Sequence, residues 1–337
     1  MANGDRIHRF GHVFVEGQDQ YLFVKSLGYG ASSQAQLVLH VQSGDLLVRK
    51  VKTERLCEAE KNIPDRENVL FYLQQQAAQR DEQPNIVRLF SANDVWAVQG
   101  PGTRLWSRVF YLKYYNGGSV GELYMKYVRA KKAMPSSLIL RLLTHVVAAL
   151  NFISSCNVLH ADLHDENIFL EVSRNEAPNF YIADFGEAEQ GALTNASNKF
   201  PEDVFMVCMN LENWLETGPD LTDDRDELWH YLNNDVHSVL ADLVDSASNQ
   251  LPDLRPLLEV LQAAPQGLPV PLDAWILPQD EDTLMPLYHT TEQGALEASR
   301  IAGPWYVMEV ALDIHNCNGL PKPIRVGLEA HDHPGDI

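Results

Sequence analysis

The sequence lacks closely spaced cysteines. Its four cysteines are far apart and form no CxxC pair: Cys57, Cys156, Cys208 and Cys317. Zinc sites and the disulfide frameworks of small secreted domains are typically recognised from such close spacings. The spacing therefore indicates neither kind of site, and it favours a reducing compartment, the cytoplasm or the nucleus.

The sequence also lacks the apolar segments that direct a chain to or across a membrane. The amino-terminal stretch MANGDRIHRFGHVF has no apolar core of signal-peptide length. No apolar run approaches the roughly 20 residues that span a bilayer. We therefore expect a protein that is neither secreted nor membrane-spanning.

Positive charge is scarce. The chain has 26 Lys and Arg against 46 Asp and Glu, which gives a net charge of −20. Such a surface repels nucleic-acid phosphates and anionic membranes, so we expect neither as a partner. What the sequence does have is 337 residues of ordinary globular composition, enough for one large or two small domains.

The pattern along the chain divides into a β-rich first third and a helical middle. Residues 20–52 and 86–115 read as strands, and residues 53–80 between them read as helical. From about residue 119 helical patterns dominate, and SSLILRLLTHVVAALNFISSCN is apolar on most faces, as in a buried helix. This order predicts an α+β protein.

Two polar motifs interrupt the apolar runs of the middle part. VLHADLHDENIFL contains Asp162 and, five residues later, Asn167, and ADFG contains Asp184. Each motif taken alone could be an ordinary polar turn of a β-hairpin. Both motifs follow Lys50 at the end of the apolar strand LLVRK, and this ordered series favours a functional site.

Together with LGYGASSQA near the amino terminus, the motifs resemble the protein kinase superfamily over residues 21–262. The resemblance implies an α+β, two-lobe protein-kinase-like fold, with a β-rich first lobe of five strands and one helix and a helical second lobe. The implied division is an extension at 1–20, the first lobe at 21–113, the second at 114–264, and a linker and tail at 265–337. Within the tail, the residue pattern itself predicts a helix near 291–301 and a strand at 305–314.

The resemblance implies ATP and Mg²⁺ as cofactors. Gly28 and Gly30 would cover the phosphates, because a backbone without Cβ atoms approaches them closely. Asn167 and Asp184 would hold the metal through the hard oxygen ligands that Mg²⁺ prefers. The implied nucleotide-binding residues are Leu27, Gly28, Gly30, Ser33, Ala35, Lys50, Lys113 and Tyr115, with Leu112 as gatekeeper. Ser33 stands where kinases have a third glycine.

The implied catalytic residues are Asp162, Lys50, Glu67 and His164. Asp162 would be the base that takes the proton of the acceptor hydroxyl. Asp165 is the alternative acid, but it stands where kinases have a non-catalytic residue, and we expect it to be exposed. Lys50 would pair the α/β-phosphates and be held by a helix glutamate, for which Glu67 is the best candidate and Glu60 and Glu58 are alternatives. Asp203 aligns with the buried helix aspartate that braces the catalytic loop in kinases.

The chain departs from the protein-kinase pattern in three places. Ala161 replaces the arginine that receives an activation-loop phosphate, so we expect an activity that is not switched in that way. His164 replaces a lysine that touches the γ-phosphate, and HxDLHxxN is similar to aminoglycoside and choline kinases. Only 16 residues separate Gly186 from Asp203, without a clear APE motif. The overall resemblance is to a divergent, fungal-type member of the superfamily.

The leading expectation is an ATP/Mg²⁺-dependent phosphotransferase, similar to Ser/Thr protein kinases, that transfers the γ-phosphate to a hydroxyl. His164 and the short segment favour a small-molecule kinase of the aminoglycoside or choline type as the alternative. The missing peptide platform favours a third reading, a nucleotide-binding pseudokinase scaffold. The implied partners are ATP and a protein or small-molecule hydroxyl acceptor.

Overall fold

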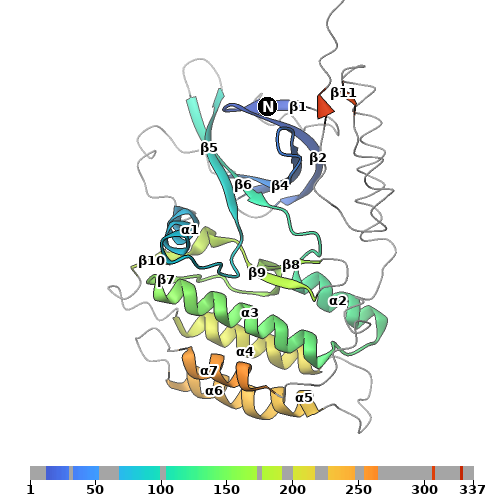
Figure 1. Ribbon diagram of the computed structural model, residues 1–337, viewed down its shortest axis with the longest axis vertical. Helices are drawn as coiled ribbons and strands as arrows, with labels where there is room; N and C mark the ends of the chain where they lie inside the picture. Colours follow the sequence, from blue (N-terminus) through green and yellow to red (C-terminus); the bar gives the residue numbers. More distant parts are fainter. Residues whose placement is uncertain are drawn as a thin grey trace, which may run out of the picture. The chain divides into compact units, whose positions relative to one another are not determined.

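The computed structural model has two compact units, each formed by separate parts of the chain (Figure 1). The first contains Met1–Ile63, Arg88–Tyr114 and Glu281–Ile337, and the second contains Pro64–Val87 and Tyr115–Asp280. The structure describes residues 13–29, 33–52, 68–98, 104–172, 177–191, 200–216, 227–246, 254–264, 306–307 and 327–328.

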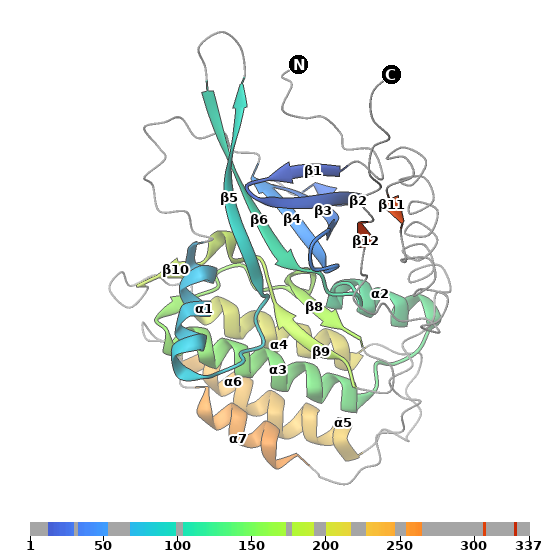
Figure 2. The same ribbon diagram turned by 45° about the horizontal axis from the view of Figure 1, so that its top comes forward.

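The first unit is built on an antiparallel sheet of six strands in the order β1-β2-β3-β4-β6-β5 (Figure 2). The strands are β1 Val13–Glu16, β2 Asp19–Tyr29, β3 Ser33–His40, β4 Leu46–Lys52, β5 Leu89–Val98 and β6 Arg104–Lys113. The predicted strand regions are thus confirmed. The expectation of five strands is wrong, because the turn at Gly17, with φ of 65°, folds β1 back onto β2. A separate pair is formed by β11, Tyr306–Val307, and β12, Gly327–Leu328.

The residues on the two sides of β4 differ in burial. In β4, Leu47 and Arg49 are buried, whereas Val48 and Lys50, which point to the opposite face, are half-buried. The buried face carries the apolar cluster of Tyr21, Val38, Leu47, Val109 and Tyr111. Lys50 therefore lies on the half-buried side of β4, opposite the side that faces this cluster.

The second unit is mainly helical, as the sequence predicts. Its helices are α1 Asn68–Arg80, α2 Val120–Ala130, α3 Ser136–Ser155, α4 Phe200–Glu216, α5 Glu227–Tyr231, α6 His237–Ser246 and α7 Arg255–Ala263. Ser119 caps α2 in a capping box with Glu122, which satisfies backbone N–H groups of its first turn. A π-helical turn at Leu232–Val236 joins α5 directly to α6, a feature that the apolar pattern does not predict.

The helix α3 confirms the predicted buried helix, but its length and hydropathy come closer to those of a membrane span than we expected. Its 20 residues include a window with mean hydropathy 1.6, enough by length and composition to cross a membrane. However, 61% of that window is buried inside the protein, and Leu138, Leu142 and Val146 are almost inaccessible. Its packing is that of a core helix.

Four short strands in the second unit hold the polar motifs. The hairpin of β8, Ile168–Glu171, and β9, Asn179–Ile182, pairs Ile168 with Ile182. The strands β7, Val158–Leu159, and β10, Glu189–Gln190, also pair in antiparallel fashion. One polar motif therefore lies between β7 and β8, and the other lies between β9 and β10.

Candidate functional site

A buried aspartate of α4 holds the backbone of the polar loop, which we define as residues 160–167. Asp203 is 3% exposed, and its two carboxylate oxygens accept hydrogen bonds from the amides of His160 and Ala161 at 3.0 and 3.1 Å. Ala161 has φ of 63°, in the left-handed region that residues other than glycine rarely adopt. Asp203 thus supports a strained backbone at the start of the loop, in agreement with its predicted position.

His160 connects the two polar motifs. It is fully buried, and its Nε2 donates to the carbonyl of Ala183 at 2.8 Å, while its Nδ1 accepts from the amide of Asp162 at 3.4 Å. Burial lowers the pKa of His160, which favours the neutral ring that this bonding pattern requires. The ring also meets the ring of Phe185 edge-on, with 4.9 Å between centroids.

The structure brings three of the predicted residues into one cluster. Nδ2 of Asn167 donates to the carbonyl oxygen of Asp162 at 2.8 Å and to its Oδ2 at 3.2 Å. The same nitrogen lies 2.9 Å from Nε2 of His164, which is 3.8 Å from Oδ2 of Asp162. Asn167 is buried, but the side chains of Asp162 and His164 are 46% and 39% exposed. A buried amide therefore orients an accessible carboxylate.

The second predicted metal ligand, Asp184, lies at the same end of the β8–β9 hairpin as Asn167. The amide of Ala183 donates to the carbonyl of Asn167 at 2.8 Å, next to the paired residues Ile168 and Ile182. Asp184 has φ of 59°, and its Oδ1 accepts from the amide of Gly186 at 3.2 Å. In the described part of the chain, no hydrogen bond involves Oδ1 of Asn167, so this hard oxygen is available to a cation.

One expectation about this loop is wrong. Asp165, the alternative acid, was expected to be exposed, but it is half-buried, and Asp162 is the more exposed of the two. Asp165 is the first residue of the 3₁₀ turn Asp165–Asn167, a compact conformation that the expectation did not include. Asp165 takes no part in the hydrogen bonds that join Asp162 to Asn167 and His164.

The first unit places three predicted nucleotide-binding residues in a row across adjacent strands. Gly28 of β2 lies opposite Ala35 of β3, and Ala35 lies opposite Lys50 of β4. Among the described residues, no atom comes within 4 Å of the place where a Cβ of Gly28 would stand, and its φ is 156°. A glycine at this position allows close approach to its backbone, as the predicted contact with a phosphate requires.

The remaining predicted residues of the first unit flank this row. Leu27 is 38% exposed, and Ser33 begins β3 opposite Lys52. Two predicted residues, Gly30 and Glu67, lie outside the described residues, as do Glu58 and Glu60.

The predicted adenine contacts lie where the chain passes from the first unit to the second. The amide of Lys113 already donates to the carbonyl of Arg88 at 2.8 Å. The side chain of Tyr115 is buried against Tyr181, with ring centroids 4.5 Å apart. The predicted gatekeeper, Leu112, pairs with Val48 on the half-buried face.

Two further residues belong with the site, although the motifs do not mark them. Val48 lies two residues before Lys50 on the same half-buried face, and the alternation of β4 could have identified it. Glu166 accepts a hydrogen bond from Oγ of Ser119 at 2.6 Å. A Cβ on Gly121 would come within 2.4 Å of the Glu166 carboxylate, so that side chain would have to shift if residue 121 were larger. No local sequence signal predicts this contact between distant segments.

Comparison with known proteins gives a consistent result. Residues 21–207 match the protein kinase domain. Serine/threonine-protein kinase chk-1 of Caenorhabditis briggsae is 25% identical over 173 residues, which is 51% of this chain and 31% of that protein. Probable serine/threonine-protein kinase nek3 of Dictyostelium discoideum is 25% identical over 214 residues, 63% of this chain and 17% of that protein. The matches thus cover less than a third of either relative.

A solved structure shares the fold. The BubR1 kinase domain superimposes with a TM-score of 0.51 at 12% sequence identity, covering 76% of this chain and 83% of that one. At this identity the likeness concerns the fold alone. It confirms the predicted two-lobe architecture of β-rich and helical parts.

Proposed function

Because the chain belongs to the protein kinase domain family, we propose that it is an ATP- and Mg²⁺-dependent phosphotransferase that acts on a hydroxyl of Ser or Thr in a protein. The observation that carries this proposal is the cluster in which the Asn167 amide orients the accessible carboxylate of Asp162. A general base needs an accessible acceptor atom held in a fixed orientation, and Asp162 has both properties.

The donor atoms at the end of the β8–β9 hairpin fit a magnesium site. Oδ1 of Asn167 is not used by the described residues, and Asp184 contributes a carboxylate at the same end of the hairpin. Carboxylate and amide oxygens are the ligands that Mg²⁺ prefers. When bound, Mg²⁺ with ATP supplies the phosphoryl group and neutralises the charge that develops on it.

The chain's own residues would then position and deprotonate the acceptor. Asp162 accepts the hydroxyl proton as the acceptor oxygen attacks. Lys50, in the row with Ala35 and Gly28, contributes positive charge beside the phosphates. Asp203 and His160 keep the polar loop in place, because their buried hydrogen bonds fix its backbone. The protein would need to form no covalent bond to the substrate, since phosphoryl transfer depends mainly on positioning and electrostatics.

A specific observation favours a second candidate, a small-molecule kinase. His164 lies within the cluster and its side chain is 39% exposed. An imidazole at this place can hydrogen-bond a small acceptor or the γ-phosphate directly, a role that a protein acceptor does not require. In this alternative Asp162 remains the base, and only the acceptor changes.

A phosphorylation assay on the full chain tests the proposal. Radiolabelled ATP and Mg²⁺ are supplied with generic protein substrates and, in a parallel reaction, with small amino-alcohols. We expect transfer to protein, and its loss in Asp162→Asn. Transfer only to the amino-alcohols supports the second candidate. Nucleotide binding without transfer to either acceptor contradicts both and indicates a pseudokinase scaffold.

A further inference from the structure

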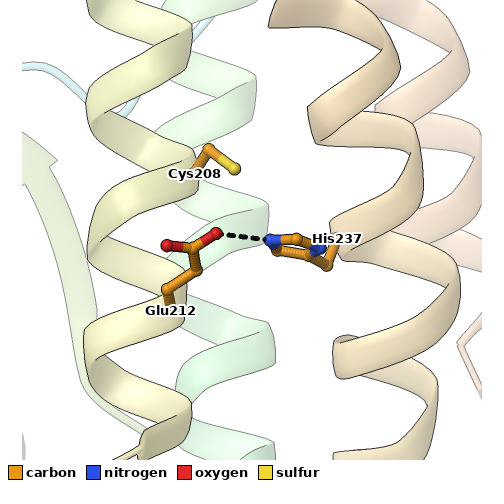
Figure 3. A group of neighbouring side chains, drawn as sticks. All are labelled: Cys208, Glu212 and His237. Atoms are coloured by element: carbon orange, nitrogen blue, oxygen red, sulfur yellow. Dashed lines mark hydrogen bonds and ion pairs between the residues drawn. The ribbon is translucent and has the colours of Figure 1, made fainter.

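A thiol, a carboxylate and an imidazole converge between α4 and α6, far along the chain from the polar loop. Figure 3 shows Cys208 and Glu212, one helical turn apart on α4, directed toward His237 at the start of α6. Their ligand atoms all lie within 4.8 Å of one another. Oε1 of Glu212 and Nε2 of His237 are joined by a hydrogen bond of 2.8 Å.

We propose that Cys208, Glu212 and His237 form a Zn²⁺ site that clips α4 to α6. Thiolate, imidazole and carboxylate are the three protein ligand types of zinc, with bonds of about 2.0–2.3 Å. Tetrahedral bonds of that length separate the ligand atoms by roughly 3.4–3.6 Å. Small side-chain rotations, which open the hydrogen bond between Glu212 and His237 and draw in the sulfur, would reach this geometry. Water would fill the fourth position.

The helix that carries His237 supplies an independent observation. A π-helical turn, Leu232–Val236, immediately precedes His237. Such turns are uncommon and occur frequently at functional sites. The wider turn rotates every residue that follows it about the helix axis, and His237 is the first of these. The π turn therefore sets the direction in which the imidazole points toward α4.

The charges of the three groups suit a divalent cation. A free cysteine thiol is protonated at neutral pH, and Cys208 is buried next to the Glu212 carboxylate. Zinc would displace that proton, because the thiolate is the form that binds metal. The bound site then has two negative ligands, one neutral imidazole and a doubly positive ion, and its net charge is zero. A neutral site is compatible with the burial of Cys208.

The cluster lacks the short CxxC spacing by which zinc sites are usually recognised in sequences. Twenty-four residues lie between Glu212 and His237, so only the packing of α4 on α6 brings them together. Bound zinc would restrict the motion of α4, which also carries Asp203, the residue that holds the polar loop. It would thus stabilise the second unit without taking part in phosphoryl transfer.

The experiment uses the full chain, freed of metals and titrated with Co²⁺ or Zn²⁺ in excess Mg²⁺. Cobalt reports the ligand type, because thiolate ligation produces a ligand-to-metal charge-transfer band. No cysteine is among the proposed catalytic residues, so the band distinguishes this site from the proposed magnesium site. We expect one equivalent of cobalt to bind with that band and Zn²⁺ to displace it. Zinc should also raise the melting temperature.

Variants locate the ligands. Loss of even an outer-shell partner typically weakens metal binding by about 10–100-fold, so Cys208→Ser and His237→Gln should each weaken Zn²⁺ binding by at least about 100-fold. Cys208→Ser should also remove the charge-transfer band. Matched controls are Cys156→Ser, the other free cysteine among the described residues, and His230→Gln, an exposed histidine. Both should bind zinc as the parent does.

The proposal is overturned if the parent chain gives no thiolate band with cobalt, or if the band persists in Cys208→Ser. Equal zinc affinity in His237→Gln and the parent also overturns it. Because serine is nearly isosteric with cysteine, Cys208→Ser should fold, and circular dichroism checks this. If that variant does not fold, His237→Gln decides. These readouts do not depend on phosphotransferase activity. A negative result for the zinc site would therefore leave the proposed function unaffected, and the reverse also holds.

Discussion

Each unit contains a buried cluster of hydrogen-bonded polar side chains. The two clusters differ in whether their outermost group is exposed to solvent. In the first unit Arg49 bonds Gln36 at 3.0 Å and pairs with Glu16, which also accepts from Tyr111. Both side chains of this ion pair are at most 10% exposed. The cluster fastens β1 to the sheet on the face away from Lys50. It is closed, because both side chains of the ion pair are almost inaccessible to solvent.

The cluster of the second unit is open at one end. Asp203 and His160 are buried, but the chain of hydrogen bonds continues to Asp162, whose side chain is 46% exposed. A buried polar network thus ends in a carboxylate that solvent can reach. The contrast teaches that burial of polar groups does not by itself indicate a site, and that only the second network has the accessible terminal group that a candidate site needs.

The largest effect is expected at that open end. Asp162→Asn should lower kcat by about 10²–10⁴-fold, because general-base catalysis contributes that much, with ATP affinity nearly unchanged. Steady-state kinetics and a separate nucleotide-binding titration measure both quantities. Asp165→Asn is the matched control and should be nearly silent. If the two variants behaved in the opposite way, Asp162 would not be the base.

The closed cluster should affect stability and leave the Asp162 cluster unchanged. Arg49→Met removes one partner of a buried ion pair and leaves Glu16 uncompensated, which typically costs about 3–5 kcal/mol in the free energy of unfolding. Urea unfolding measures this loss, and Lys132→Met, at an exposed lysine, is the control. A loss below about 1 kcal/mol, the range of surface pairs, would mean that the cluster is effectively solvated.

Substitution of Asp203 should affect both stability and catalysis. In Asp203→Asn an amide nitrogen faces one of the two backbone N–H groups, and an unsatisfied buried donor costs about 1–3 kcal/mol in stability. Because Ala161 is strained, the loop should also relax, and kcat should fall more than the affinity for ATP does. Asp242→Asn, at an exposed aspartate of α6, controls for the charge. Unchanged kcat in a folded Asp203→Asn protein would show that the loop does not need this brace.

The smallest effect concerns pH. His145 accepts a hydrogen bond from the amide of Phe180 through Nδ1 at 3.1 Å, and burial, with the positive charge of Arg141, lowers its pKa to about 4. The unfolded chain, with a pKa near 6.5, binds this proton more readily, so the contribution to stability is complete above pH 6.5 and is lost as the pH falls toward 4.

The measurement is urea unfolding at several pH values between 7.5 and 4.5. His145→Asn retains an acceptor near the position of Nδ1 but cannot titrate, so its stability should depend less steeply on pH in this window. The same slope in both proteins would assign the acid sensitivity to other groups.

Much of this architecture was predictable because it follows from local patterns. The strands around Lys50, the apolar helix α3, and the spacing of Asp162, Asn167 and Asp184 all appear in the sequence and are present in the structure. The strand β1 was missed because a four-residue strand has too short a pattern to detect. The exposure of Asp165 was wrongly predicted because the sequence motif does not reveal the 3₁₀ turn in which this residue lies.

The contacts between distant segments were not predictable. The capping of α2 gives no indication that Ser119 bonds Glu166, and the buried faces of α4 and α6 give no indication that Cys208 meets His237. Such contacts depend on how helices pack, and a single sequence does not encode them in its spacing.

The order of strands in the first unit has a consequence for synthesis on the ribosome. All six strands of the sheet come from residues 13–113, so the sheet can close before the rest of the chain is made. The polar loop is different, because its backbone is held by Asp203, about 40 residues further along the chain. The sheet that would bind phosphates can therefore fold first. The polar loop, which would activate the acceptor, can reach its final conformation only after α4 has been synthesised.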